Sequence, residues 1–141
     1  MPRLPQLNTY YLYYYILRLP LYPMTAFSRF LYGFVYAGRG IADLLLHHRN
    51  AKIHLLAAVV AIGSAATFKI SRVEWCLVVL CIGVVLAAEA MNTALEYLTD
   101  LVSPEYHELA RKTKDMAAGA VLLVAFAAAI VGALVFVPKF W

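Results

Sequence analysis

Three apolar segments, separated by short polar stretches, constrain the fold of this chain more than any other feature of its sequence. They cover residues 53–68, 73–98 and 116–138, and the second contains no charged residue between Trp75 and Ala88. A helix that crosses the hydrocarbon core of a bilayer needs about 20 mainly apolar residues. The first segment is shorter, and Lys69 reaching the interface would complete it. The sequence therefore predicts three transmembrane helices, with a turn at residues 69–72 and a polar connection at residues 99–115.

The composition supports a small all-α integral membrane protein. Hydrophobic residues make up 64% of the chain and charged residues 14%, which is too little polar surface for a water-soluble domain of 141 residues. The formal net charge of +4 is too small to indicate a nucleic-acid partner, and it fits basic flanks beside apolar spans. Cys76 and Cys81 have no metal-ligand spacing, and their place inside an apolar segment disfavours a disulfide.

Basic residues are distributed unevenly between the two sides of the predicted spans. Residues 27–52 and the connection at 99–115 hold seven of them, and the opposite side holds three. The seven are Arg29, Arg39, Arg49, Lys52, Arg111, Lys112 and Lys114, and the three are Lys69, Arg72 and Lys139. Because basic loops stay in the cytoplasm, we expect residues 27–52 and 99–115 there and the C-terminus outside.

Residues 27–48 are partly apolar but are interrupted by Arg29, Arg39 and Asp43. We interpret them as an amphipathic helix lying in the membrane interface. A fourth span is the alternative, which the three charged residues disfavour. Residues 1–25 lack the features of a signal peptide, and we expect an extension that is disordered or precedes a true start at Met24. The domain would then cover residues 26–141.

Four polar residues follow one another at helical spacing at the end of the second apolar segment. Glu89, Asn92, Glu96 and Asp100 share one face of a helix, which we call the carboxylate stripe. An acidic residue in mid-membrane costs about 2.5–3.5 kcal/mol, so such residues usually mark function. A helix end entering water is the ordinary alternative, and it fits Asp100 better than Glu89. The candidate partners of the stripe are Arg111, Lys112, Lys114 and cations from solution.

Carboxylates beside basic residues suit Mg²⁺ and phosphate groups. Mg²⁺ prefers carboxylate oxygens and completes its shell with substrate phosphates, while lysines neutralise a phosphoryl group in transfer. Glu89, the deepest carboxylate, is a candidate general base. The residues indicate phosphoryl transfer at the membrane surface, although no Walker motif or glycine-rich phosphate loop is present in the sequence.

The stretch "EAMNTALEYLTD", followed by "EYHELARKTKDMAAGAVLL", closely resembles the signature of the small prokaryotic diacylglycerol kinases, a family that includes undecaprenol kinases. The resemblance covers about residues 27–138. It implies a surface helix, three spans and a homotrimer in the bacterial inner membrane, with active sites where cytoplasmic loops meet the bilayer.

The resemblance also implies roles for individual residues. Glu89 matches the catalytic base that takes the proton of the lipid hydroxyl, and Glu96 matches a Mg²⁺ ligand. Asn92 matches a residue that orients the site, and Gly40 lies on the nucleotide-facing side of the surface helix. The residues implied to contact ATP are Arg29, Tyr36, Glu96, Glu105, Tyr106, His107, Lys114 and Asp115.

One departure concerns the metal. The family usually has a second metal-binding glutamate where "HRNAKIH" places His48, and neutral histidine is a poor ligand for Mg²⁺. Either His48 fills the position weakly, or Glu96 and the nucleotide hold the metal alone, or Asp43 replaces the missing carboxylate, or the enzyme is weakened.

We therefore expect an ATP- and Mg²⁺-dependent kinase that phosphorylates a membrane lipid alcohol, either undecaprenol or diacylglycerol. Asn50, Ile53 and His54 favour undecaprenol. The alternatives are a catalytically impaired relative and a proton- or ion-conducting oligomer, in which Glu89 alone would have a role.

Overall fold

The computed structural model describes residues 25–141. Our interpretation of residues 1–25 as an N-terminal extension therefore lies outside the described residues, apart from residue 25. All the regular elements of the described chain are helices: α2 (Ala26–His47), α3 (Arg49–Thr67), α4 (Arg72–Val102), α5 (Glu108–Phe136) and the short 3₁₀ helix η1 (Val137–Phe140). Of these, α3, α4 and the run Glu108–Phe140 are long and apolar enough to cross a membrane. The prediction of an all-α protein with three such helices is confirmed.

The chain divides at Arg39 into two units, which we describe separately. The first contains the N-terminal part of α2, whose large apolar side chains are exposed, among them Phe27, Phe30 and Phe34. Phe30 and Phe34, four residues apart, meet edge to face with ring centroids 5.1 Å apart. Residues 27–48 thus form the predicted helix, shifted by one residue, while its position in the membrane interface stays a prediction.

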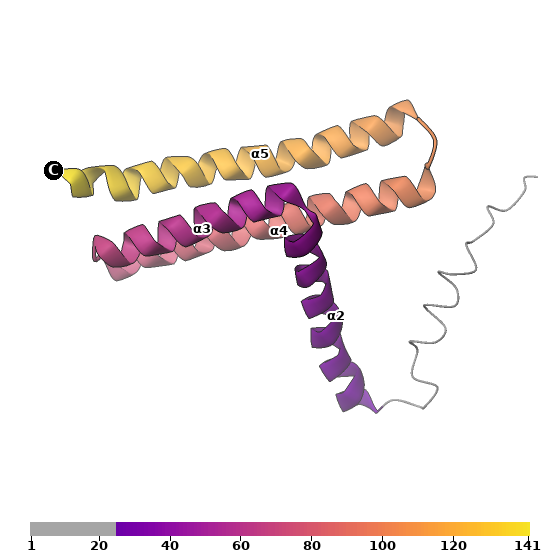
Figure 1. Ribbon diagram of the computed structural model, residues 1–141, viewed down its shortest axis with the longest axis horizontal. Helices are drawn as coiled ribbons and strands as arrows, with labels where there is room; N and C mark the ends of the chain where they lie inside the picture. The colour runs from indigo at the N-terminus through magenta and orange to yellow at the C-terminus, as the bar shows by residue number, and fades with distance from the viewer. Residues whose placement is uncertain (1–24) are drawn as a thin grey trace, which may run out of the picture. The chain divides into compact units, whose positions relative to one another are not determined.

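In the second unit, α4 packs against both α3 and α5, whereas α3 and α5 barely touch each other (Figure 1). In α3 and α4 one set of buried residues recurs every seven positions, as in coiled coils. In α3 they are Ala51, Ala58 and Ala65, and in α4 they are Val78, Val85 and Asn92. Alanines on α3 allow its backbone to approach α4 closely.

The turn between α3 and α4 ends one helix and starts the next. The backbone N–H of Ile70 donates to Ala65 O (3.3 Å) and that of Lys69 to Ala66 O (3.4 Å), which is a Schellman motif. Lys69 adopts the left-handed conformation (φ 48°) that this motif requires. Ser71 then caps α4 in a capping box with Glu74, and Glu74 also pairs with Lys139 at 2.9 Å. This end of the bundle is therefore closed by local and long-range contacts.

The helices are longer than the apolar segments that predicted them. α4 continues to Val102 beyond the apolar run, and α5 begins at Glu108, eight residues before Met116. A helix needs no lipid around it once its backbone bonds are made, so polar helical turns extend past the apolar spans. The functional candidates lie on these extensions and on the turn between them.

Candidate active site

One turn of α4 buries three polar side chains inside the bundle. Glu89 is 2% exposed, and Asn92 and Thr93 are each 5% exposed. Three of their atoms have no hydrogen-bond partner among the described residues: Glu89 Oε2, Asn92 Oδ1 and Thr93 Oγ1. Burying such an atom without a partner costs about 1–3 kcal/mol. Packing alone does not explain this turn, which supports a functional role. We had not predicted Thr93, although its place four residues after Glu89 puts it on the same face.

The length of α4 sets the depth of this turn. Its 31 residues span about 46 Å at 1.5 Å per residue, against about 30 Å of hydrocarbon. If the hydrocarbon begins at Arg72, Glu89 lies about 26 Å along the helix, roughly one helical turn inside the opposite boundary. Glu96 and Asp100 then lie beyond that boundary. The carboxylate stripe therefore runs from the edge of the hydrocarbon into the headgroup region.

Asn92 joins two members of the stripe. Its side-chain amide Nδ2 donates to Glu96 Oε1 at 3.1 Å, a contact between residues four apart on one helix. The bond fixes one carboxylate oxygen of Glu96 and leaves the other with no hydrogen bond from a described residue. Asn92 thus contacts Glu96, and its role in orienting the site stays a prediction.

Asp100, the last member of the stripe, forms an ion pair with Lys114 of α5. Lys114 therefore pairs with the carboxylate stripe, as expected. The expectation is wrong for Arg111 and Lys112, which pair with acidic residues of their own helix. The reason is local geometry, because Glu108 and Asp115 lie three or four residues away and need no tertiary contact to be reached.

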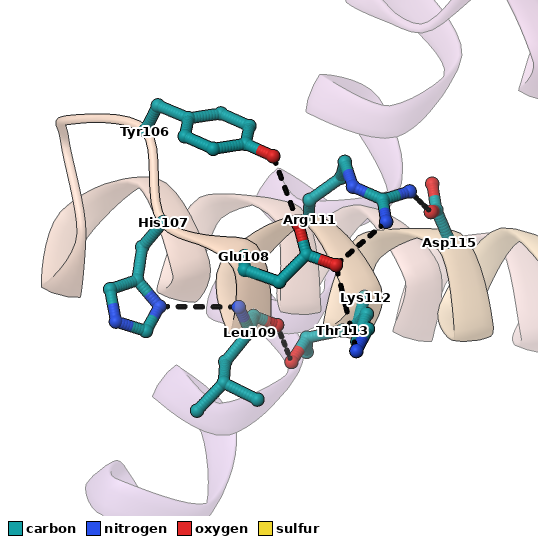
Figure 2. A network of polar contacts seen from close by, with 8 residues as sticks. All are labelled: Tyr106, His107, Glu108, Leu109, Arg111, Lys112, Thr113 and Asp115. Carbon is teal, nitrogen blue, oxygen red and sulfur yellow. Dashed lines mark hydrogen bonds and ion pairs between the residues drawn. The ribbon is translucent and has the colours of Figure 1, made fainter.

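Figure 2 shows this second network, in the polar first turns of α5, before its apolar span. Arg111 bridges Glu108 (Nη2–Oε1 3.0 Å) and Asp115 (Nη1–Oδ2 2.7 Å), and Lys112 lies 3.5 Å from the same oxygen of Glu108. The Tyr106 hydroxyl donates to the other oxygen of Glu108 at 3.0 Å. The Arg111 guanidinium, helped by this hydroxyl, lowers the pKa of Glu108. Sequence reasoning missed Glu108, although its spacing from Arg111 was a usable signal.

A polar pocket of about 280 Å³ opens between the end of α4 and the start of α5. Glu105, Tyr106, His107 and Lys114 all line it, so four residues predicted to contact ATP come together. Its wall also includes Asp100, Ser103 and Arg111. His107 caps α5 by accepting the backbone N–H of Leu109 at Nδ1 (3.2 Å), which leaves Nε2 for a ligand. Asp115 does not line this pocket, and it contacts Arg111 rather than Lys114.

The remaining predicted nucleotide residues lie on α2. Arg29 and Tyr36 are exposed in the first unit, and the guanidinium of Arg39 lies 5.8 Å from the centre of the Tyr36 ring. Gly40 begins the second unit, and a Cβ there would meet nothing within 4 Å. The roles of these residues stay predictions.

The residues around the proposed metal position differ in how well they suit Mg²⁺. Glu96 offers a carboxylate oxygen, which suits this ion when phosphates complete the shell. His48 uses Nε2 in a 2.8 Å hydrogen bond with the Tyr97 hydroxyl, so this nitrogen is engaged. The described residues contain no group of three or more His, Cys, Asp or Glu that would hold a metal by themselves. The donor set therefore fits Mg²⁺ held by one carboxylate together with a nucleotide.

Residues 35–136 match the model of the family described as prokaryotic diacylglycerol kinase. The chain belongs to this family. The resemblance inferred from the signature motif is confirmed, and the family is one of membrane lipid kinases.

Individual relatives agree with this assignment. The chain is 39% identical over 112 residues to the undecaprenol kinase of Bacillus subtilis (strain 168). The match covers 79% of this chain and 91% of that protein. It is 40% identical over 109 residues to a diacylglycerol kinase of Synechocystis sp., covering 77% of this chain and 62% of that protein. It is 26% identical over 106 residues to the diacylglycerol kinase of Escherichia coli (strain K12), and the match covers 75% of this chain and 87% of that protein.

Proposed function

We propose that this member of the prokaryotic diacylglycerol kinase family transfers the γ-phosphate of ATP to the hydroxyl group of a membrane lipid alcohol. The observation that carries the proposal is Glu89, a carboxyl group that is 2% exposed and directly follows the uncharged run 75–88 of α4. Its Oε2 has no hydrogen-bond partner among the described residues. Such a group destabilises the fold and has no structural partner to justify it. The family assignment and the names of the relatives support a kinase reaction at this position.

Glu89 is the proposed general base. The lipid hydroxyl loses its proton to Glu89 while its oxygen attacks the γ-phosphorus, and the bond to the β-phosphate oxygen breaks to release ADP. Because Glu89 is buried, its side chain must rotate or the helices must part slightly for this contact. An apolar groove of about 400 Å³ between α3, α4 and α5 reaches Val85 and Leu86, one turn before Glu89, and offers room for a lipid chain.

ATP is proposed to bind at the polar pocket between α4 and α5. Lys114 would exchange its ion pair with Asp100 for a phosphate, and the loop from Glu105 to His107 would contact the nucleotide. Asp115, Arg29, Tyr36 and Gly40 are the further residues that the family motif assigns to this role. The support for the proposal is that the pocket gathers cationic and polar side chains beside the stripe.

Mg²⁺ is the proposed metal, with Glu96 as its protein ligand and Asn92 as the residue that orients Glu96. When bound, the ion would neutralise charge on the transferring phosphoryl group. His48 is not proposed as a ligand, because Nε2 is used in a hydrogen bond with Tyr97. Replacement of the usual glutamate would then be compatible with activity, provided that the phosphates supply the remaining oxygen ligands.

Undecaprenol is the proposed acceptor. The undecaprenol kinase of B. subtilis matches this chain at 39% identity over 91% of its own length, and Asn50, Ile53 and His54 favour the same branch. The relatives named diacylglycerol kinase make diacylglycerol the second acceptor to test. We further propose a homotrimer in the bacterial inner membrane with its active sites on the cytoplasmic face, where the basic residues of 99–115 gather.

The test is a transfer assay with purified protein in detergent, ATP and Mg²⁺, in which undecaprenol and diacylglycerol are offered separately. We expect phosphate transfer to undecaprenol, and Glu89→Gln should lower the rate by about 10²–10⁴-fold because the general base is lost. The matched control is Glu74→Gln, which removes a carboxylate from the other end of the same helix. This control should be less stable, since Glu74 caps α4 and pairs with Lys139, but active per folded molecule. Full activity in a folded Glu89→Gln protein would refute the proposal.

A further inference from the structure

The junction between α2 and α3 has an unusual construction. His48 is the single non-helical residue between Ala26–His47 and Arg49–Thr67, with φ −100° and ψ 121°. It occupies the N-cap position of α3 without making a side-chain cap hydrogen bond. A helix start without a capping side chain lacks a stabilising contact. We call residues 43–48 the elbow, and its geometry must be held by other contacts.

Those contacts run to α4. The Tyr97 hydroxyl donates to Asp43 Oδ2 at 2.8 Å, and His48 Nε2 lies 2.8 Å from the same hydroxyl oxygen. The rings of His48 and Tyr97 also meet edge to face, with centroids 5.5 Å apart. These hydrogen bonds join residues 54 and 49 positions apart in the sequence. Tyr97 is therefore the residue of α4 to which the elbow is tied.

The direction of each bond follows from counting hydrogens. A tyrosine hydroxyl has one hydrogen, and here Asp43 receives it. The bond between His48 and Tyr97 therefore needs a hydrogen on His48 Nε2, which donates to the hydroxyl oxygen. The second oxygen of Asp43 is occupied too, because His47 Nδ1 lies 3.0 Å from Oδ1. The set forms a relay from His48 through Tyr97 to Asp43.

This protonation state disagrees with metal binding through Nε2 of His48. A ring nitrogen that carries a hydrogen has no lone pair for a metal, so Nε2 donates rather than coordinates. His48 thus links protein groups through Nε2. Tyr97 directly follows Glu96, and Glu96 is itself fixed by Asn92. One turn of α4 therefore holds the proposed metal ligand and the anchor of the elbow side by side.

We propose that Tyr97 is a positioning residue. Through its hydrogen bonds with His48 and Asp43, it holds the elbow against the turn of α4 that carries Glu96, without a metal ion. The significance for catalysis rests on the proposed function, whereas the tether itself does not. Half of the Tyr97 side chain is exposed, so the hydrogen bonds rather than burial define where the hydroxyl lies.

The first measurement needs no enzyme activity. Hydrogen–deuterium exchange of the backbone amides of residues 44–52 is followed in the full-length protein in detergent, without nucleotide and with EDTA. We expect Tyr97→Phe to speed this exchange about tenfold, because it removes one oxygen and with it both hydrogen bonds. Tyr32→Phe is the matched control, since Tyr32 is exposed on α2 with no hydrogen bond in the described chain, and it should exchange like the native protein.

The same experiment separates a metal-free tether from a metal site. Adding Mg²⁺ should leave elbow exchange in the native protein unchanged, and His48→Ala combined with Tyr97→Phe should be no faster than Tyr97→Phe alone, because both remove one relay. Unchanged exchange in Tyr97→Phe would overturn the tether. Protection that appears in the native protein only with Mg²⁺ would also overturn it, since His48 would then act through the metal.

The positioning role is tested by kinetics on the same variants. In Tyr97→Phe the Mg²⁺ concentration for half-maximal phosphate transfer should rise about tenfold, while the KM for the lipid alcohol stays constant. An unchanged Mg²⁺ requirement together with faster elbow exchange would overturn the positioning role. If the native protein transfers no phosphate to either lipid, the proposed function fails, and the tether is judged on exchange alone.

Discussion

Replacing Glu89 with leucine should make the protein inactive and more stable at the same time. In the native chain the Glu89 side chain is 2% exposed, and Oε2 accepts no hydrogen bond from a described residue. An unpartnered buried acceptor costs about 1–3 kcal/mol, and leucine has a similar size without a polar atom. We therefore expect the free energy of unfolding to rise by about 2 kcal/mol. For a chain of this length that corresponds to an increase in melting temperature of about 6 °C.

Thermal unfolding followed by circular dichroism in detergent measures this gain, and the transfer assay measures the loss of activity. Met91→Leu is the control, because Met91 lies two residues away but is 64% exposed, and its melting temperature should change little. Glu89→Gln keeps a polar side chain and should gain much less than Glu89→Leu. A lower melting temperature for Glu89→Leu than for the native protein would refute the reasoning, since it would mean that the carboxyl group has a stabilising partner in the folded protein.

Three further predictions concern the turns and the nucleotide pocket. Lys69→Gly should stabilise the protein by about 1 kcal/mol in chemical or thermal unfolding, because glycine adopts the left-handed φ of 48° without strain, and a destabilised variant would contradict this. Ser71→Ala should destabilise it by about 1 kcal/mol in the same assay, through loss of the α4 cap, whereas an unchanged melting temperature would show that the cap is dispensable. Lys114→Met should raise the KM for ATP at least tenfold, because the pocket loses a cation that would bind phosphate. Asp100→Asn should lower the KM for ATP by about two- to fivefold, because Lys114 no longer has a competing ion pair. A raised KM for ATP in Asp100→Asn would exclude the proposed exchange of partners.

The apolar pattern was sufficient to predict the helices that form the bundle. Segments 53–68, 73–98 and 116–138 correspond to α3, α4 and α5, since apolar length reports membrane-spanning helices directly. The helix ends were less predictable. Hydropathy marks where the chain leaves the lipid, whereas a helix ends where capping and turn residues stop it, as His107 and Lys69 show.

The site was predictable where its residues lie on one helix. The spacing of Asn92 and Glu96 is enough to expect contact, and the structure has the hydrogen bond. The choice of ion-pair partners across helices was not predictable. Arg111 could pair with acidic residues of its own helix or with the carboxylate stripe of α4, and in the structure it pairs with Glu108 and Asp115. The bond between His48 and Tyr97 depends on how an elbow packs against α4, which no local pattern encodes.

The closed end of α4 has a mechanical consequence for chemistry at its other end. α4 is one unbroken rod, and the capping box, the Glu74–Lys139 ion pair and the Phe68–Phe140 contact clamp its beginning. From Glu74 to Glu89 the rod measures about 22 Å, so a pivot of about 5° at the clamp would displace Glu89 by about 2 Å and Asp100 by more than 3 Å. A misplacement of about 1 Å is enough to slow a reaction about a hundredfold. The clamp has three separate contacts, so Glu74→Gln alone should leave Glu89 in place because the remaining contacts still hold this end. Loss of all three contacts would free α4 to pivot at this end and would slow phosphate transfer at the other.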